Sequence, residues 1–430
     1  MGHQRGWALT TERFLASLLI ALPILLGSVT QAQEWTRFRG PNGQGISDAT
    51  MIPIKWTESD YNWKVELPGG GHSSPVIWGD KVFVTSGDAK VGRGVLLALS
   101  VSDGRVVWQK QFSLKAYKTN NLNSFATATP AVDANCVYVL WTSPDETILA
   151  ALDHEGTEMW TRSLEGVQCQ HGAGSSPIVY DDMVVFTHEH EDIINKDAQS
   201  AWIAVDRKTG QARWTLPRQT GPKTSYSTPC VYRPATEAPQ LIFTSCSHGM
   251  TSVDPATGKV IWAMESALPA RVVSSPVIAD ELLIAACGDG GAGKRLAAIR
   301  PGTRDGSVRA AEAYKIDSGI RPYVPTCLSK DGLLFAFYDP GNIACLRIGT
   351  GERLWQEKPA GRFFGSPVWV SGRLYCITMD GDVVVIKAAD KYELLAINPL
   401  GETSHATPAV ADGRMYLRTY SHLFCVGAKK

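Results

Sequence analysis

The sequence predicts an all-β fold, an eight-bladed β-propeller of four-stranded antiparallel blades that is closed by an N-terminal strand. Three observations support this prediction. A serine or threonine followed by proline recurs along the chain, with the prolines 41 to 55 residues apart. Short apolar segments separated by turn residues follow each copy, and most repeats end in a glycine turn and a tryptophan. A repeat of this period, made of short strands, is typical of a propeller blade.

The dipeptide that opens each repeat marks the first strand of a blade. That strand lines the central channel and is an edge of its sheet, where proline is tolerated because it has no N–H to donate. An eighth copy, Val324-Pro325-Thr326, is degenerate. The seven regular copies begin at Ser74, Thr129, Ser176, Thr228, Ser275, Ser366 and Thr407.

The repeat that begins at Ser176 shows how one blade forms. Its apolar and β-branched segments predict four strands. In the turn Asp206–Gly210, the aspartate can accept hydrogen bonds from the turn backbone and the glycine can adopt a positive φ. The four predicted strands are 176–180, 183–186, 201–205 and 211–216.

A tryptophan on the outer strand is the third recurring feature. We expect each indole to fill the space between neighbouring blades. The fifth repeat is disrupted between Arg300 and Ala313, and the seventh has Leu395 at this position. The tryptophans that follow a turn glycine are Trp108, Trp160, Trp214, Trp262 and Trp355.

The two ends of the chain complement each other. The last repeat, Thr407–Gly427, supplies three strands, and a spare strand, Tyr61–Leu67, precedes the first repeat. We expect this spare strand to complete the last blade, because closure removes the sheet edges that would otherwise pair with other chains.

Residues 1–32 have the features of a signal peptide. Arg5 and Arg13 precede an apolar run, and Thr30-Gln31-Ala32 suits cleavage after Ala32. The alternative is an uncleaved anchor, although the run is shorter than the about 20 residues of a spanning helix. No cysteine lies near the cleavage site, which argues against a lipid anchor. We therefore expect residues 33–430 to form a single propeller domain, a monomer that is periplasmic or secreted.

Charge and cysteine content restrict the function further. The chain has 42 basic and 42 acidic residues, which argues against bulk electrostatic binding of nucleic acid. Most of its nine cysteines lie in apolar strands, as small buried thiols do. The best candidate for a disulfide is Cys230 with Cys246, which are placed symmetrically about the turn at 233–239.

Two stretches resemble the tryptophan-docking repeat A-x-D-x-x-T-G-x-x-x-W of quinoprotein-type propellers. Ala204–Trp214 matches the repeat, and Ser252–Trp262 departs only by serine in the first position. The opening Trp35–Gly43 resembles the start of exported bacterial proteins with PQQ-like repeats. The resemblance covers essentially all of residues 33–430 and implies the propeller fold more strongly than any activity.

The resembled family has an enzymatic and a non-enzymatic branch. PQQ-dependent alcohol dehydrogenases place a vicinal Cys-Cys disulfide over the quinone and supply Glu, Asn and Asp ligands to calcium. This sequence has no Cys-Cys pair, and the calcium ligands do not map onto it. The resemblance is therefore closer to the BamB-like branch, which implies no cofactor; PQQ with calcium belongs to the alternative. Because the lipid-anchoring cysteine of that branch is missing, the same partners do not follow.

A candidate binding site lies where the links between blades meet. These links share one face with the loops between second and third strands, and we call it the top face. Basic and aromatic residues there predict a funnel for an anionic or aromatic ligand or a peptide carboxylate, or else solvated charges only. We expect charge reversal of Arg271, Arg321 and Arg362 together to leave the melting temperature nearly unchanged. The candidate residues are His72, Lys223, Tyr226, Arg271, Arg321, Tyr323, Arg362, Phe363 and His405.

Two long insertions, 112–128 and the loop that begins at His188, are also expected on the top face. His188 and His190 would point the same way on a strand, and with nearby carboxylates they could hold zinc; a solvated loop is the alternative. The glycine-rich segments Gly172–Ser176 and Gly288–Lys294 precede or join strands, so they do not fit a phosphate-binding loop.

The sequence thus predicts an exported binding or scaffold module for envelope or secreted proteins or peptides. A PQQ-dependent dehydrogenase is the alternative. A hydrolase or lyase with a metal on the top face is a weaker one. Whether the protein catalyses a reaction stays open.

Overall fold

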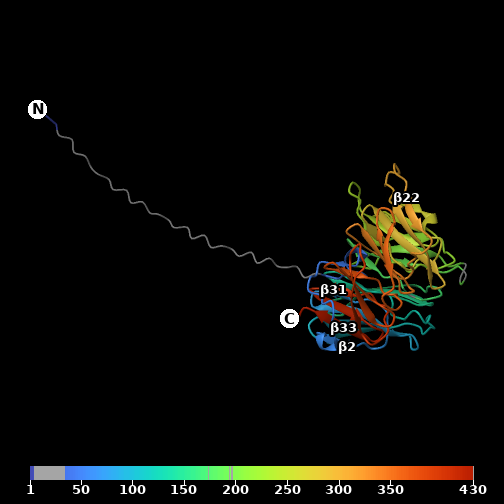
Figure 1. Cartoon of the computed structure of the whole chain (residues 1–430), viewed down its shortest axis with the longest axis horizontal. Helices are drawn as coiled ribbons and strands as arrows, with labels where there is room; N and C mark the ends of the chain where they lie inside the picture. The colour runs from blue at the N-terminus through green and yellow to red at the C-terminus, as the bar shows by residue number, and fades with distance from the viewer. Residues whose placement is uncertain (4–33, 173, 193, 195–196, 430) are drawn as a thin grey trace. The chain divides into compact units, whose positions relative to one another are not determined.

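A computed structural model describes residues 1–3, 34–172, 174–192, 194 and 197–429. The predicted cleavage site and nearly all of the predicted signal peptide lie outside these residues. The described residues from Glu34 to Lys429 belong to one compact unit, which is the propeller (Figure 1). Within the described ranges, no helix is long and apolar enough to cross a membrane.

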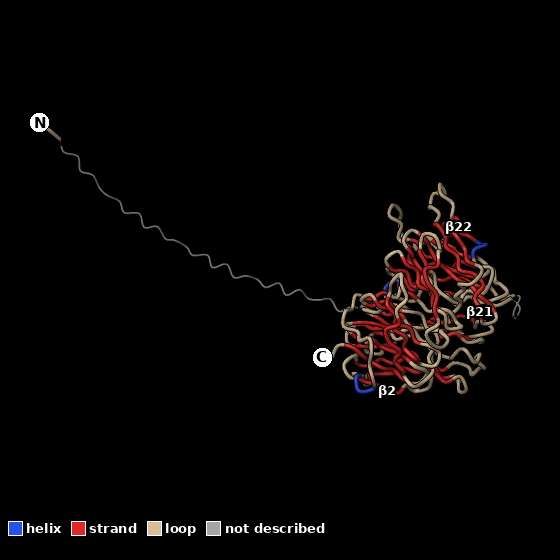
Figure 2. Tube along the Cα trace, viewed as in Figure 1, coloured by secondary structure: helices blue, strands red, loops and turns tan. Residues whose placement is uncertain are grey.

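The described residues form eight β-sheets, one per blade, in which the blade strands pair antiparallel, as the sequence predicts. Seven have four strands, and the sheet of blade 7 has a short fifth strand. Figure 2 shows the strands in red. The described part of the chain has three single-turn 3-10 helices, η1 (Pro41–Gly43), η2 (Glu58–Asp60) and η3 (Glu265–Ala267). Blade 1 comprises β3 (Val76–Trp78), β4 (Lys81–Asp88), β5 (Arg93–Ser100) and β6 (Val106–Ser113), and blade 2 comprises β7 (Ala131–Val132), β8 (Cys136–Thr142), β9 (Glu146–Asp153) and β10 (Glu158–Glu165). Blade 3 comprises β11 (Ile178–Tyr180), β12 (Met183–His188), β13 (Ser200–Asp206) and β14 (Ala212–Arg218), and blade 4 comprises β15 (Cys230–Tyr232), β16 (Gln240–Ser245), β17 (Gly249–Val253) and β18 (Val260–Met264).

The other four blades have the same order from the channel outward, and blade 8 combines the two ends of the chain. Blade 5 comprises β19 (Val277–Ala279), β20 (Leu282–Asp289), β21 (Ala292–Arg300) and β22 (Ala311–Ile316), and blade 6 comprises β23 (Leu328–Lys330), β24 (Leu333–Phe337), β25 (Ile343–Arg347) and β26 (Arg353–Glu357). Blade 7 comprises β27 (Val368–Val370), β28 (Arg373–Ile377), β29 (Asp382–Lys387) and β30 (Leu394–Pro399), together with β1 (Ile46–Ser47). Blade 8 comprises β31 (Ala409–Ala411), β32 (Arg414–Arg418) and β33 (His422–Gly427), together with β2 (Trp63–Glu66).

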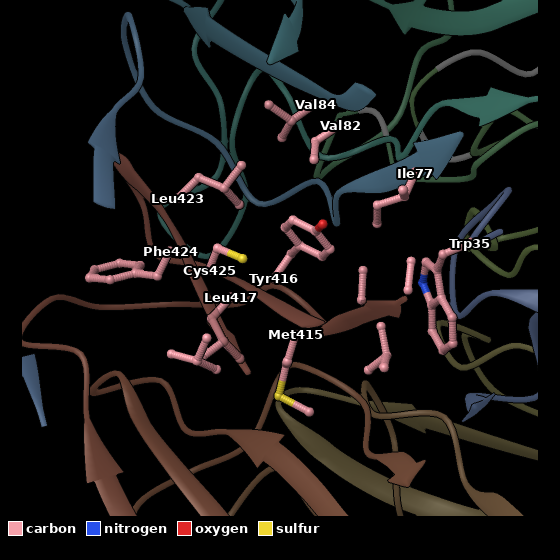
Figure 3. Packing of buried hydrophobic residues seen from close by; sticks show 14 of the residues in the cluster. Trp35, Ile77, Val82, Val84, Met415, Tyr416, Leu417, Leu423, Phe424 and Cys425 are labelled. Atoms are coloured by element: carbon pink, nitrogen blue, oxygen red, sulfur yellow. The ribbon is translucent and has the colours of Figure 1, made fainter. Parts of the chain in front are cut away.

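The N-terminal strand closes the ring, as predicted. In blade 8, β2 pairs antiparallel with β33, and Trp63 lies opposite Cys425. Figure 1 shows blue β2 beside red β33. The indole N–H of Trp63 donates to the Val101 carbonyl of blade 1 at 3.0 Å. Figure 3 shows the buried cluster around this junction, where Tyr416 and Leu423 face residues of blade 1.

The outer-strand tryptophans pack against the blade that follows them, which confirms their predicted place. The indole N–H of Trp108 donates to the His154 carbonyl of the following blade at 2.8 Å. A Cβ at Gly156 in that turn would lie 2.8 Å from the same indole, so the turn requires glycine. In the disrupted fifth repeat, Tyr314 packs against Gly351 in the same way.

The serine and threonine of the repeated dipeptide form a closed ring of hydrogen bonds around the channel. Each backbone N–H donates to the side-chain hydroxyl of the corresponding residue in the next blade, over 2.9 to 3.3 Å. In blade 6 the ring residue is Thr326, and Cys327 takes the place of proline, which explains the degenerate copy. We call the set the hydroxyl ring: Ser74, Thr129, Ser176, Thr228, Ser275, Thr326, Ser366 and Thr407.

The segment before β2 closes one end of the channel, which the sequence did not predict. Trp35 pairs with Ile77 in the first strand of blade 1. Asn42 exchanges two hydrogen bonds of 2.8 Å with the backbone of Val231 in blade 4, and β1 pairs in parallel with β27 in blade 7. The segment therefore spans the channel; we call residues 34–47 the plug. Its partners all follow the hydroxyl ring in sequence, so the plug lies at the end away from the top face.

The predicted disulfide between Cys230 and Cys246 is wrong. Both thiols are free. The hairpin register pairs Cys230 with Ile242 and Tyr232 with Gln240, so continuation of this register places Cys246 four residues from the position opposite Cys230. Burial raises the pKa of the Cys230 thiol to about 12.

Candidate functional site

A cavity of about 480 Å³ occupies the channel at its top-face end. Seven residues of the hydroxyl ring and Phe38 of the plug line it, together with residues of the links between blades. Because the plug closes the other end, the cavity is a blind pocket. Its size is in the range of pockets that bind small ligands or a few side chains.

Most of the candidate residues lie around this cavity. They come from different blades because each link leads toward the channel. The residues of the predicted set that line the cavity are His72, Lys223, Tyr226, Arg271, Tyr323 and His405.

Three predicted residues lie outside the cavity. Arg321 and Arg362 are exposed. Phe363 is fully buried, with its ring centroid 5.1 Å from that of Phe337. The next residue, Phe364, lines the cavity instead. Successive residues of an extended segment point to opposite sides, so a shift of one residue exchanges core and channel.

Arg271 is buried, contrary to the expectation of a solvated arginine. It is 3% exposed and forms an ion pair of 2.8 Å with Glu191, which is 0% exposed. Its guanidinium also donates to Gln170 Oε1 at 3.0 Å and lies 2.8 Å from His171 Nε2. Reversing this charge would leave two buried carboxylates facing each other. The premise that all three arginines are solvated is therefore wrong for Arg271, and we now expect a lower melting temperature for a charge reversal that includes it.

The His/Glu-rich loop of blade 3 anchors the link to blade 4. Glu191 accepts the Thr224 N–H at 3.1 Å, and Glu189 accepts the Ser225 N–H at 3.3 Å and the Trp202 indole N–H at 2.8 Å. Burial raises the pKa of Glu189 to about 7. These contacts position the link that carries Lys223 and Tyr226.

His188 and His190 belong to the packing of this loop. Both are buried, and their ring centroids are 5.0 Å apart. His188 Nε2 lies 2.9 Å from the Glu165 carbonyl, and His190 Nδ1 accepts the Gln168 N–H at 3.3 Å. Burial lowers the pKa of His190 to about 4. Within the part of the chain that the structure describes, no group of three or more His, Cys, Asp or Glu residues could hold a metal ion.

Aromatic groups form the wall of the pocket where blades 7, 8 and 1 meet. His72 stacks on His405 with ring centroids 4.2 Å apart, and Phe364 lies 4.8 Å from His405. Exposed Arg362 stacks on Phe364 at 5.6 Å. Burial holds the pKa of His72 well below its usual range, so this imidazole is neutral at physiological pH.

Asp339 lies in the loop after β24 of blade 6 and is 1% exposed. Its carboxylate accepts the N–H groups of Tyr323 at 3.1 Å and Val324 at 3.3 Å, and so fixes the link before blade 6. Burial raises the pKa of Asp339 to about 6.

The described residues thus form a closed eight-bladed propeller with a blind pocket at one end of its channel. The sequence model of the family described as "Outer membrane protein assembly factor BamB" matches residues 54–228, 204–309 and 339–427. The matches cover most of the chain, so the chain belongs to this family, and the predicted BamB-like resemblance is confirmed. Outer membrane protein assembly factor BamB of Yersinia pestis is 21% identical over an alignment of 383 residues that covers 85% of this chain and 78% of that protein.

Solved structures of both branches share the fold. BamB from Moraxella catarrhalis has a TM-score of 0.56 at 14% identity and covers 85% of this chain and 98% of its own. A europium-containing methanol dehydrogenase has a TM-score of 0.67 at 13% identity and covers 90% of each chain. Quinohemoprotein alcohol dehydrogenase from Comamonas testosteroni has a TM-score of 0.68 at 13% identity and covers 92% of this chain and 81% of its own. At such identities the likeness shows the fold alone.

Sequence reasoning missed the residues that complete the pocket from a distance. Phe38 is far from the first repeat in sequence, and its only signal was the opening stretch Trp35–Gly43. Glu191 was noticed only as a possible neighbour of zinc. Asp339 follows a strand without any motif.

Proposed function

We propose that this protein is exported and acts as a binding scaffold in the assembly of outer membrane or other envelope proteins. Membership of the family described as an outer membrane protein assembly factor supports the process. The observation that carries the mode of action is the blind pocket, because every blade sends a link or loop to its mouth. A protein or peptide segment would bind at this mouth, and the propeller would hold it without chemical change.

The test is purification from the native envelope, followed by a binding assay with the partner that co-purifies. The variant Lys223→Glu/Arg362→Glu reverses two charges at the mouth. Its matched control, Lys208→Glu/Lys259→Glu, reverses two exposed charges in turns on the opposite face. We expect at least tenfold weaker binding for the mouth variant only. Loss of binding in the control, with normal binding by the mouth variant, would contradict a top-face site.

The fold shared with the dehydrogenases suggests a second candidate function, PQQ-dependent oxidation of alcohols. The residues here do not fit the cofactor well, because the chain has no adjacent cysteines and Glu191 is committed to Arg271. We expect PQQ with calcium to show no stoichiometric binding and no dye-linked alcohol oxidation. Tight binding with turnover would favour the dehydrogenase.

A further inference from the structure

The hydroxyl ring presents hydrogen-bond donors to the pocket. Each ring hydroxyl already accepts an N–H from the neighbouring blade. Its remaining capacity is to donate its own proton. Among the hydrogen bonds of the described residues, none uses a proton of these hydroxyls. Seven of the eight residues line the pocket, so a circle of O–H donors surrounds the channel axis.

Two buried arginines of the plug lie directly beneath this ring. The Arg37 guanidinium donates to the Pro229 carbonyl at 2.6 Å, and Arg39 donates to the Pro367 carbonyl at 3.4 Å. These two prolines follow the ring residues Thr228 and Ser366. Arg37 is 6% and Arg39 0% exposed, and Phe38, which lines the pocket, stands between them in sequence.

The charges of these two arginines are not compensated. Nε of Arg37, and Nε and one terminal nitrogen of Arg39, have no hydrogen-bond partner. Within the described ranges, neither guanidinium forms an ion pair with a carboxylate. Burial lowers the pKa of both to about 10, so both stay protonated at neutral pH. A buried charge without a partner is costly, and an anion nearby would offset that cost.

The acidic residues of the pocket do not neutralise this end of it. Asp339 already accepts two backbone N–H groups, and Asp289 lies 3.7 Å from Lys294. Asp289 ends β20 and Asp339 follows β24, so both lie at the top-face ends of second strands, at the mouth and not beneath the ring. The lower end of the pocket therefore combines O–H donors with a net positive charge.

We propose that the hydroxyl ring above Phe38 is an anion-binding site for a carboxylate or a phosphate group. The ring hydroxyls donate hydrogen bonds to the anion, and Arg37 and Arg39 attract it through space. The wider mouth above admits either a free small anion or the carboxylate at the end of a peptide. This site does not depend on the proposed scaffold function, because it requires no partner protein.

Calorimetric titration of the purified protein tests the site, in chloride buffer at constant ionic strength. The probes are inorganic phosphate, acetate, and triglycine with a free or an amidated carboxyl terminus. We expect saturable binding of one anion per protein. A preference of at least tenfold for free over amidated triglycine would identify a peptide terminus as the ligand. Equal or tighter binding of phosphate would identify a free anion. Both results support the site, and absence of saturable binding by any probe would overturn it.

Variants locate the binding. Arg37→Gln/Arg39→Gln should weaken the affinity at least tenfold, whereas the control Arg213→Gln/Arg304→Gln, in partly exposed ion pairs of outer turns, should leave it unchanged. If the plug variant does not fold, Thr129→Val/Thr407→Val removes two ring donors with little change in shape and should weaken binding at least threefold. Unchanged affinity in a folded variant of either kind would overturn the proposal.

Discussion

The two ends of the channel are built from different kinds of chain. At the plug end, one continuous segment, residues 34–47, crosses the channel and is held mainly through the backbone of first strands. At the mouth, short links from every blade meet, and polar side chains such as Glu191 and Asp339 hold them in place. At the plug end, backbone groups and the side chains of Arg37, Arg39 and Asn42 bind the backbone of first strands, whereas at the mouth individual carboxylates accept the N–H groups of the links. This difference indicates that the plug end closes the channel, whereas the positions of the links at the mouth depend on individual carboxylates.

Deletion of the N-terminal segment should have the largest effect. Removing residues 33–67 takes away the plug and β2, exposes a sheet edge of blade 8 and strips Trp63 from its place between blades. Loss of a buried tryptophan alone costs about 3–5 kcal/mol. We expect aggregation or a large drop in melting temperature. Removing residues 33–47 alone keeps β2 and should give a smaller drop. Equal melting curves for the wild type and the longer deletion would contradict closure by β2.

Glu191→Ala should have the next largest effect, and it tests the mouth. It leaves the buried Arg271 guanidinium without its ion pair and the Thr224 N–H without its acceptor. Breaking a buried ion pair in this way costs about 3–5 kcal/mol. Chemical denaturation should show that loss, whereas the exposed control Glu165→Ala should change stability by less than about 0.5 kcal/mol. A small effect of Glu191→Ala would mean that Arg271 is solvated in solution.

Thr129→Val examines the hydroxyl ring that separates the two ends. The variant keeps the shape of the side chain and leaves the buried Ser74 N–H without its acceptor. An unsatisfied buried donor costs about 1–3 kcal/mol. The free energy of unfolding should fall by that amount, and Thr215→Val on the exposed outer strand β14 serves as the control. Equal stabilities of the two variants would show that the ring is dispensable.

The smallest expected effect is the pH dependence that Asp339 contributes at the mouth. Burial raises the pKa of its carboxyl from 3.8 to about 6, so between these values the folded state binds more protons than the unfolded state. Its contribution therefore makes the free energy of unfolding fall as the pH rises from about 4 to about 6, on the order of 1–2 kcal/mol. Asp339→Asn should remove this slope, and the exposed control Asp331→Asn should keep it. An identical slope in Asp339→Asn would show that Asp339 is not buried in solution.

The fold could be predicted because each blade repeats the same local pattern. The Ser/Thr-Pro dipeptide, the Asp/Gly turn and the outer tryptophan can be recognised in a single repeat. Their recurrence in the following repeats supports the assignment of each blade. The site was predicted only in part. The links to the channel were recognised, but neighbouring Phe363 and Phe364 exchange roles because the sequence does not show where an extended link enters its strand.

The sequence by itself determined the number of blades, their strand order and the closure of the ring, because these follow from periodic local patterns and from one spare strand. Only the tertiary structure decided that Arg271 meets Glu191, 80 positions away, and that Arg39 meets Pro367, 328 positions away. No local pattern encodes such pairs. They form because closure of the ring brings links and plug to one axis, where polar side chains from distant segments become buried together.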